Sequence, residues 1–362
     1  MTLLRKCVTL SYYLSLWAIT LTNQSIKRIG FACKFSEINS KGEVVSVPEM
    51  NTGGTTLAWA KRQTRSVAED KVMEVARRNI THTHNLVKKI ASLEPQLRMV
   101  RLTSDMLSFY TEPSWKDFWQ TTDVQNELAK MFAPIGETAR ANDVRLSFHP
   151  GQFTVLASER DEVVNKSIEE FEYHCDMVRW MNYGKTFQDF KVNVHISGRR
   201  GPQGIRDVYN RLSPEARNTL TLENEEYTHG LLDCLSLSDL VPTVMDIHHF
   251  WIREGEYIQP TDDRVKMVID SWRGVRPTLH YSVSREDVLV GHSGSQLPNH
   301  GALIEAGHSK QKLRAHSDYM WSDAVNGWAL TFLDNFDMMA ESKAKNLASF
   351  ALYERAKQRG IF

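Results

Sequence analysis

Short apolar runs alternate with longer, charged segments along most of the chain. Eight of these runs are rich in β-branched and aliphatic residues, and we predict that each forms a strand. They span residues 28–33, 97–102, 144–148, 191–196, 219–222, 243–247, 277–281 and 336–339. The intervening segments have apolar positions at helical spacing, which predicts helices at 66–93, 123–141, 161–183, 205–212, 230–239, 262–272 and 342–357.

Eight strands that are each followed by a helix form the pattern of a single (β/α)8 TIM barrel, an α/β fold. We assign this barrel to residues 28–362. Two connections, 34–64 and 285–334, are too long for a minimal barrel, and we expect them to be long loops at its carboxyl-terminal face. Barrel enzymes bind their substrates at that face.

Residues 1–27 are predicted to be an extension outside the barrel. Arg5 and Lys6 precede an apolar run over 8–21 that resembles a signal peptide. This run is too short to span a bilayer, hydroxyl side chains interrupt it, and no clear small-x-small cleavage site follows it. We therefore expect a cytoplasmic protein, associated with the nucleoid in a bacterium, rather than a secreted one.

The composition excludes several classes of protein. Hydrophobic residues make up 41% of the 362 and charged residues 24%, which is typical of a globular chain and excludes disorder, collagen and coiled coil. Lys plus Arg and Asp plus Glu number 44 each, so no overall positive field attracts nucleic acid. The four cysteines are far apart and form no CxxC motif, which argues against a disulfide framework and a thiolate zinc site.

Residue types that bind metal ions lie at or just after the ends of nearly all the predicted strands. Four are carboxylates and five are histidines: Asp105, His149, His195, Glu223, Asp246, His249, His280, His316 and Glu341. One such histidine alone is more often structural than a ligand, but in a parallel barrel these strand ends all meet at one face. Nitrogen ligands beside carboxylates favour Mn²⁺, Zn²⁺ or Fe²⁺, so we predict a multinuclear transition-metal site.

Several metal ions in one pocket are typical of enzymes that hydrolyse phosphodiesters. Such ions would also let a protein without net charge bind DNA, because they neutralise phosphates. Basic residues of the predicted loops would supply further contacts: Lys34, Arg62, Arg65, Arg199, Arg200, Lys310, Lys312 and Arg314. Each of these residues, taken alone, is more often a solvated surface charge.

Eight short motifs follow one another along the chain. They are RIGFAC at 28–33, VRLTSDM at 100–106, SFHPGQF at 147–153, VNVHISG at 192–198, LTLENEE at 220–226, VMDIHHF at 244–250, RPTLHYS at 276–282 and MMAESKAK at 338–345. In this order they resemble the UV damage endonuclease family, most specifically in HPGQ, in LEN and in the Asp-x-x-His of Asp246 and His249. The resemblance implies a xylose-isomerase-like TIM barrel that cuts DNA 5′ of cyclobutane dimers and (6-4) photoproducts, leaving a 3′-hydroxyl and a 5′-phosphate.

The resemblance also implies up to three metal ions, usually Mn²⁺, with Zn²⁺ or Mg²⁺ as alternatives. By resemblance, His149, His195 and Glu223 would hold the first ion, with Asp105 nearby. Glu223 would bridge to a second ion, held also by Asp246, His280 and Glu341. His249 and His316 would hold the third. We expect catalysis to depend most on Glu223, Glu341 and His249.

A photoproduct weakens stacking and pairing, so flipping its nucleotides out of the duplex costs less than in intact DNA. By resemblance, Gln152 and Phe153 of the HPGQ loop would fill the gap, and Phe31 would line the lesion pocket. Ordinary packing at the barrel rim is the alternative for both phenylalanines. The remaining DNA contacts are assigned to Arg199, Arg200 and Lys343.

The chain departs from the family at a few positions. Phe31 and Phe153 stand where relatives often have Tyr. Phe keeps the stacking surface but lacks the hydroxyl, and so loses a hydrogen bond worth about 1 kcal/mol. Thr278 stands where some relatives have a lysine that can be carboxylated, and this affects the third metal site. Asp105 stands where some relatives have a histidine. A carboxylate is a harder ligand than an imidazole, so Asp105 favours Mn²⁺ over Zn²⁺.

Three alternative functions remain open from the sequence. An abasic-site endonuclease and a metal-dependent sugar isomerase or epimerase would use the same barrel, because a fold does not determine a function. A binding protein for damaged DNA without catalysis would be expected to have lost several ligands. As partner we expect damaged double-stranded DNA, with no membrane and no nucleotide cofactor, bound by a monomer.

Overall fold

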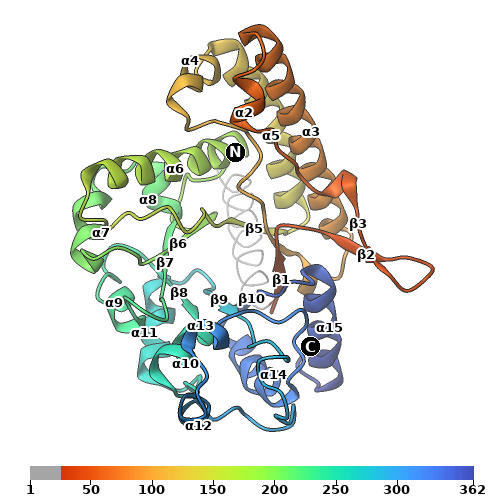
Figure 1. Cartoon of the computed structure of the whole chain (residues 1–362), viewed down its shortest axis with the longest axis vertical. Helices are drawn as coiled ribbons and strands as arrows, with labels where there is room; N and C mark the ends of the chain where they lie inside the picture. Colours follow the sequence, from red (N-terminus) through yellow and green to blue (C-terminus); the bar gives the residue numbers. More distant parts are fainter. Residues whose placement is uncertain (1–25) are drawn as a thin grey trace, which may run out of the picture.

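A closed barrel of eight parallel strands lies at the centre of the computed structural model, which describes residues 26–362 (Figure 1). The strands are β1 (Ile29–Ala32), β4 (Met99–Arg101), β5 (Arg145–Phe148), β6 (Lys191–His195), β7 (Leu220–Glu223), β8 (Thr243–Asp246), β9 (Thr278–Tyr281) and β10 (Asp337–Ala340). Their order around the barrel is β1, β10, β9, β8, β7, β6, β5 and β4. All eight predicted strands are thus confirmed, with ends that differ by at most two residues.

Helices surround the barrel (Figure 1). Ten of them are α3 (Arg65–Ala91), α5 (Thr122–Ala141), α6 (Asp161–Trp180), α7 (Gly201–Tyr209), α8 (Pro214–Thr219), α9 (Leu231–Leu235), α10 (Ile247–Glu254), α11 (Asp263–Ser271), α14 (Asp323–Leu330) and α15 (Asn346–Gln358). Short turns form 3-10 helices at Pro48–Met50, Pro95–Leu97, Pro113–Trp115 and Thr331–Asp334, and the four-residue helix α4 spans Lys116–Trp119. Each of the seven predicted helices coincides with one of these, and the single TIM barrel is confirmed.

Local sequence signals explain where the helices begin. The α3 helix follows Thr64, whose side chain accepts a hydrogen bond from the backbone N–H of Val67, and its apolar stripe is buried against the barrel. Helix α10 starts at once after β8, because the Asp246 carboxylate accepts hydrogen bonds from two N–H groups of its first turn. It ends at Gly255, which has a φ of 76° that glycine adopts without strain.

The two long connections contain more structure than expected. The first, 34–64, includes the antiparallel pair β2 (Ser36–Ile38) and β3 (Val44–Ser46), which projects from the side of the barrel in Figure 1, and the short helix α2 (Leu57–Ala60). The second, 285–334, includes α14 and two short helices, α12 (His300–Glu305) and α13 (Lys310–Leu313). Both follow the carboxyl end of a barrel strand, so both lie on the predicted side.

The amino-terminal ends of several strands are joined by one buried carboxylate. Asp337, the first residue of β10, accepts hydrogen bonds from Arg28, Arg145 and Arg276, at 3.3, 2.7 and 2.9 Å. It also accepts one from the backbone N–H of Arg28 at 3.0 Å. This network connects the segments that enter β1, β5, β9 and β10.

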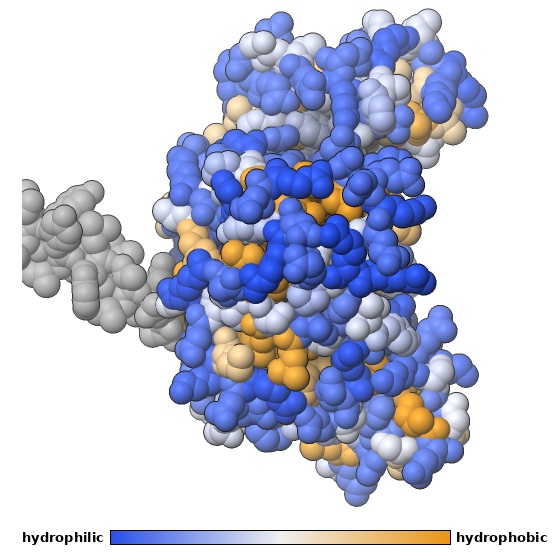
Figure 2. Space-filling model, turned by 90° about the vertical axis from the view of Figure 1, so that its left-hand side faces the viewer, coloured by the Kyte–Doolittle hydropathy of each residue, from blue (hydrophilic) through white to orange (hydrophobic). Residues whose placement is uncertain are grey.

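The side of the molecule shown in Figure 2 is mostly hydrophilic, and its hydrophobic residues form small, separate patches. Among residues 26–362, no helix combines the length and the apolar character needed to cross a bilayer. The predicted extension over 1–27, with its apolar run, lies almost entirely outside the described residues.

Candidate metal centre and DNA-binding surface

Seven of the nine predicted metal ligands meet at the carboxyl ends of the strands. They form three groups in which one ligand atom from each residue lies within 4.8 Å of the others: His149, Glu223 and His280; His195, Glu223 and His249; and Asp246, His280 and Glu341. Because Glu223 and His280 each belong to two groups, the three groups form a single cluster. The strand topology alone predicted this convergence of residues that are far apart in the chain.

Glu223 lies at the middle of the cluster, and its side chain is only 1% exposed. Its Oε2 atom is 3.1 Å from His149 Nε2 and 3.0 Å from His280 Nδ1. Asn193 of β6 donates a hydrogen bond to the same oxygen, and the Thr221 hydroxyl donates to the Asn193 side chain at 2.7 Å. This chain of hydrogen bonds fixes the orientation of the Glu223 carboxylate, as hydrogen bonds to metal ligands commonly do.

The protonation states of Glu223, His149, His195 and His280 suit metal binding. Burial alone would raise the pKa of Glu223, but His280 and His195 hold that pKa well below its ordinary value. Burial lowers the pKa of His149 and His195, and it lowers the pKa of His280 to about 4. Ionised carboxylates and neutral imidazoles are the forms that bind transition metals.

Two buried ligand atoms lack hydrogen-bond partners among residues 26–362. One is Asp246 Oδ2, whose partner oxygen Oδ1 accepts hydrogen bonds from the backbone of α10. The other is His280 Nδ1, which lies 3.0 Å from Glu223 and 3.3 Å from Glu341 but outside hydrogen-bond geometry. Buried polar atoms without partners are costly, and a divalent cation would satisfy both. The donor set therefore fits a metal centre.

The pKa of His249 is shifted upward, whereas those of His149, His195 and His280 are shifted downward. Burial lowers its pKa, but Asp246 and Glu223 outweigh burial and raise the pKa to about 9. Burial raises the pKa of Asp246 to about 8, with Glu223 and Glu341 adding to the rise. The carboxylates around His249 thus stabilise a positive charge at this point of the cluster.

Two basic residues of the cluster, one half-buried and one buried, were not found by sequence reasoning. Arg101, the last residue of β4, forms an ion pair with Glu341, and Lys191 of β6 has its Nζ atom 3.1 Å from His280 Nε2. Burial lowers the pKa of Lys191 to about 7. The available signal was a charged residue inside an otherwise apolar strand, because such a side chain is rarely buried without a partner.

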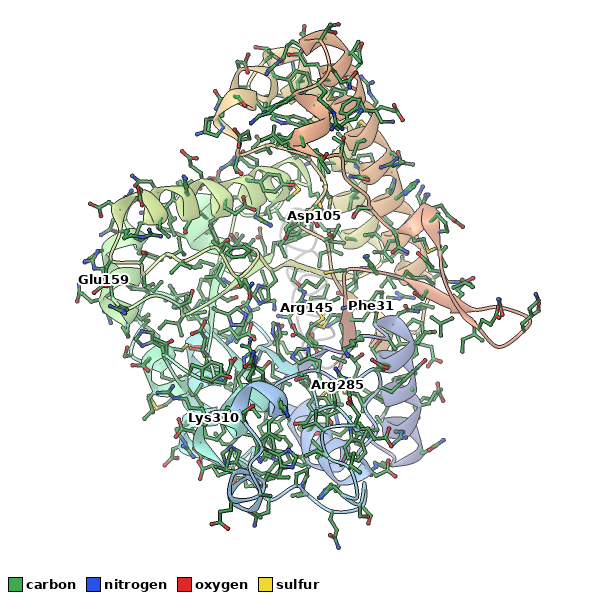
Figure 3. All side chains as sticks on the ribbon, viewed as in Figure 1. Phe31, Asp105, Arg145, Glu159, Arg285 and Lys310 are labelled. Carbon is green, nitrogen blue, oxygen red and sulfur yellow. The ribbon has the colours of Figure 1, made fainter. Side chains whose placement is uncertain are left out.

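Two predicted ligands lie outside the three groups. Asp105 is exposed and lines a separate polar cavity of about 430 Å³ with Glu170 and Tyr173, toward α6 in Figure 3. His316 lies in the loop before α14, with its ring centroid 6.3 Å from that of His248. Both residues follow irregular loop segments rather than strand ends, so topology alone did not fix where their side chains point.

The residues predicted to bind a lesion differ in their surroundings. Gln152 and Phe153 lie on the loop after β5, and Phe153 is 85% exposed, so it takes no part in core packing. Phe31 is 0% exposed, and its ring packs against Phe35 and Phe350 at centroid distances of 6.0 and 6.2 Å. Figure 3 shows it beside α15. Of the two predictions for Phe31, ordinary packing agrees with its burial, because a fully buried ring cannot stack on a base in this conformation.

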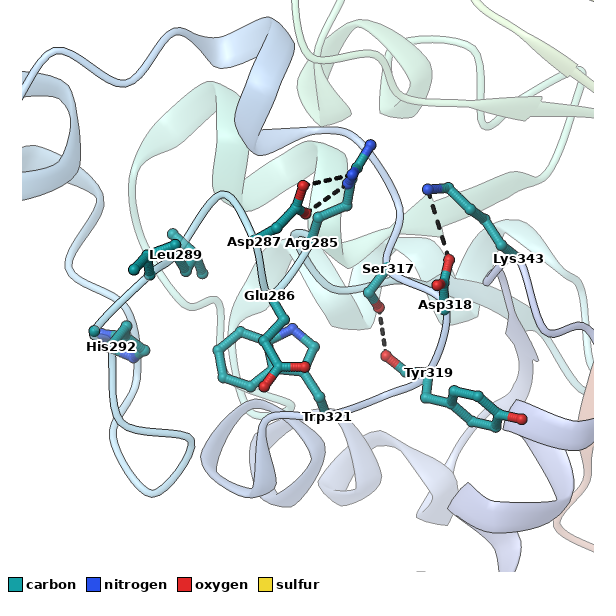
Figure 4. Close-up of a pocket in the computed structure, with 12 residues that line it drawn as sticks. Arg285, Glu286, Asp287, Leu289, His292, Ser317, Asp318, Tyr319, Trp321 and Lys343 are labelled. Carbon is teal, nitrogen blue, oxygen red and sulfur yellow. Dashed lines mark hydrogen bonds and ion pairs between the residues drawn. The ribbon is translucent and has the colours of Figure 1, made fainter.

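The basic residues assigned to DNA contacts are each paired with a carboxylate. Arg199 lies 3.6 Å from Glu159, and Arg200 forms an ion pair with Asp207. Lys343 lies 3.6 Å from Asp318, at the rim of a cavity of about 770 Å³ in the long connection before β10 (Figure 4). Pairs as exposed as these exchange partners at little cost, so they leave the cations available to phosphates.

Comparison with known proteins decides the family. A family model described as UV-endonuclease UvdE matches residues 27–361. The chain belongs to the UV-endonuclease family. The UV DNA damage endonuclease of Bacillus cereus strain B4264 is 24% identical over 323 residues, which cover 84% of this chain and 90% of that protein. That of Bacillus mycoides strain KBAB4 is 24% identical over 324 residues, covering 85% and 90%.

A solved structure shares the fold. The crystal structure of SacUVDE has a TM-score of 0.67 and 21% identity, and the similarity covers 92% of this chain and 99% of that one. The predicted resemblance to the UV damage endonuclease family and the predicted barrel are thus confirmed. Membership of this family supports a repair nuclease that acts on UV-damaged DNA.

Proposed function

We propose that the protein is a metal-dependent endonuclease that cuts the DNA backbone immediately 5′ of cyclobutane dimers and (6-4) photoproducts. The observation that carries the proposal is the cluster in which Glu223 is common to two ligand groups, at the open face of the barrel of a UV endonuclease. Metal ions bound there would provide hydroxide at neutral pH and stabilise charge on the phosphate and on the leaving oxygen.

The residues would hold up to three ions, and Mn²⁺ suits the mixture of nitrogen and oxygen donors. We assign His149, His195 and Glu223 to the first ion, and Glu223 with Asp246, His280 and Glu341 to the second. His249 and His316 are assigned to the third. Asp105 stays a predicted ligand that would need its loop to move toward the cluster.

Buried polar neighbours orient these ligands. Asn193 holds one oxygen of Glu223, and Arg101 holds one oxygen of Glu341. Lys191 contacts His280 Nε2 and leaves Nδ1, which faces the carboxylates, for coordination. Each contact restricts its ligand to one orientation, so little ordering remains to be done when the phosphodiester binds.

A lesion would be held by the exposed tip of the HPGQF loop. Phe153, four residues after the proposed ligand His149, presents its ring to solvent and can fill the space that a flipped nucleotide leaves. Gln152 beside it can hydrogen-bond exposed base edges. Arg199, Arg200 and Lys343 would bind flanking phosphates.

Replacing Gln152 and Phe153 together with Ala is expected to lower the preference for damaged over intact duplex about 5- to 150-fold, because stacking on an aromatic ring contributes about 1–3 kcal/mol per base. Competition binding with a duplex that carries one dimer measures this ratio. Phe31→Leu is the control: it alters a buried side chain, so it should lower the melting temperature and keep the ratio. An unchanged ratio in the double variant would exclude the loop as the lesion wedge.

The function is tested with an end-labelled duplex that carries one defined cyclobutane dimer, incubated with Mn²⁺ or with a chelator. We expect a single cut immediately 5′ of the dimer, with Mn²⁺ only, and no cut in an undamaged duplex. Cleavage restricted to a duplex with an abasic site would instead assign abasic-site endonuclease activity. No cleavage of any duplex would contradict a nuclease and favour a sugar isomerase or a binding protein.

A further inference from the structure

A second cavity, of about 480 Å³, lies at the amino-terminal face of the barrel. Arg28 precedes β1, Arg145 and Lys191 are the first residues of β5 and β6, and Arg276 lies two residues before β9. The amino ends of parallel strands meet at the face opposite the carboxyl ends. This cavity therefore lies at the other face from the metal centre, and no predicted ligand or DNA-binding residue lines it. Lys191 lines it and also contacts the predicted ligand His280. Arg145, in the middle of the barrel in Figure 3, marks its position.

Positive charge exceeds negative charge around this cavity. Four arginines line it: Arg28, Arg140, Arg145 and Arg276. Lys191 lines it too, but burial lowers its pKa to about 7 and its Nζ atom lies 3.1 Å from His280 Nε2, so it adds less positive charge. Two carboxylates, Asp143 and Asp189, line it as well, and the buried Asp337 lies behind three of the arginines.

The carboxylates already have partners. Asp143 forms an ion pair with Arg28, and Asp189 accepts hydrogen bonds from the backbone N–H groups of residues 184–186. The Asp337 carboxylate accepts hydrogen bonds from three guanidinium groups. The cavity therefore keeps an excess of positive charge that an anion would neutralise.

Two arginines have unused capacity toward such an anion. Arg140 donates to the backbone carbonyl of Met181 at 2.8 Å and stacks 4.8 Å over the ring of Tyr183, and no carboxylate among residues 26–362 is within ion-pair distance of it. Arg28 is buried, and its Nε atom has no hydrogen-bond partner among the described residues. A buried N–H without a partner is costly, so a ligand oxygen there would be stabilising.

We propose that this cavity binds a small phosphorylated molecule through its phosphate group. Guanidinium groups match the oxygens of phosphate in geometry and charge. A volume of about 480 Å³ suits a small molecule, whereas a DNA duplex would contact only the rim. Tyr183, which is half-buried and lines the cavity, is available to contact an organic group attached to the phosphate.

The test uses the full-length protein with inorganic phosphate, AMP and adenosine at constant ionic strength. Calorimetry measures affinity, and hydrogen–deuterium exchange locates the site. We expect phosphate and AMP, but not adenosine, to slow exchange in residues 139–146, 183–191 and 274–277. Equal affinity for phosphate and AMP would identify free phosphate as the ligand, and tighter binding of AMP would identify an organic phosphate. Slower exchange only around the metal ligands, or none, would overturn the proposal.

Variants separate this cavity from the metal centre, which could also bind phosphate. Arg140→Gln removes an exposed cation that forms no ion pair among the described residues, and should weaken phosphate binding at least about tenfold. Lys130→Gln, in the same helix α5 but outside the cavity, should leave the affinity unchanged. Protection of these segments should persist in Glu223→Gln, so a failed nuclease assignment would not affect the result. Unchanged affinity in Arg140→Gln would overturn the proposal.

Discussion

Replacing Glu223 with Gln is expected to lower the rate of dimer-dependent incision at least about 1,000-fold, or about 4 kcal/mol in activation free energy. Glu223 belongs to two of the three ligand groups, so one substitution removes an anionic donor from both. Gln has nearly the same shape and can still accept the hydrogen bond from Asn193, so the fold should persist. Single-turnover incision with saturating Mn²⁺ measures the rate, and thermal unfolding checks the fold.

Glu225→Gln is the matched control. Glu225 lies two residues further along the same loop, is half-buried, and belongs to none of the ligand groups. Burial, with Glu226 next to it, raises its pKa to about 7, so the substitution removes only about half a charge at neutral pH. Its incision rate should stay within a few-fold of the parent. Incision by Glu223→Gln at a rate near that of the parent would exclude the metal-bridging role.

The barrel was predictable because each strand is a short, nearly continuous apolar run that charged helices separate. The pair β2 and β3 was missed since its side chains are mostly exposed, so the segment has no buried face to produce a hydrophobic pattern. Helix α10 was missed for another reason. It begins directly after β8, so the apolar residues of strand and helix merge into one run in the sequence.

The candidate site was predictable where a ligand directly ends a strand. His195, Glu223 and Asp246 are the last residues of their strands, and the topology brings them together. Asp105 comes four residues after β4 ends, and the intervening loop turns it toward α6. The exposure of Phe31 depended on which face of β1 it occupies. Since β1 is only four residues long, the sequence pattern does not reveal this.

Replacing Asp337 with Asn is expected to lower the free energy of unfolding at pH 7 by about 3–5 kcal/mol, the usual cost of removing one partner from a buried ion pair. The fully buried carboxylate is shared by Arg28, Arg145 and Arg276, and Asn would leave these three charges without their common partner. Urea unfolding measures the difference. Asp334→Asn is the control, because its side chain is 77% exposed and its ion pair with Lys27 should contribute less than about 1 kcal/mol.

The same substitution should change how stability depends on pH. Burial would raise the pKa of Asp337, but Arg145 and Arg28 outweigh burial and hold the pKa below its ordinary value. A carboxylate whose pKa is lower in the folded state stabilises the fold above its unfolded pKa, about 3.9, and loses that contribution as the pH falls through the folded pKa. The difference between parent and Asp337→Asn should therefore be largest near pH 7 and shrink below pH of about 4. Equal unfolding free energies at pH 7 would show that the arginines are held by other contacts, such as the backbone carbonyls around Arg276.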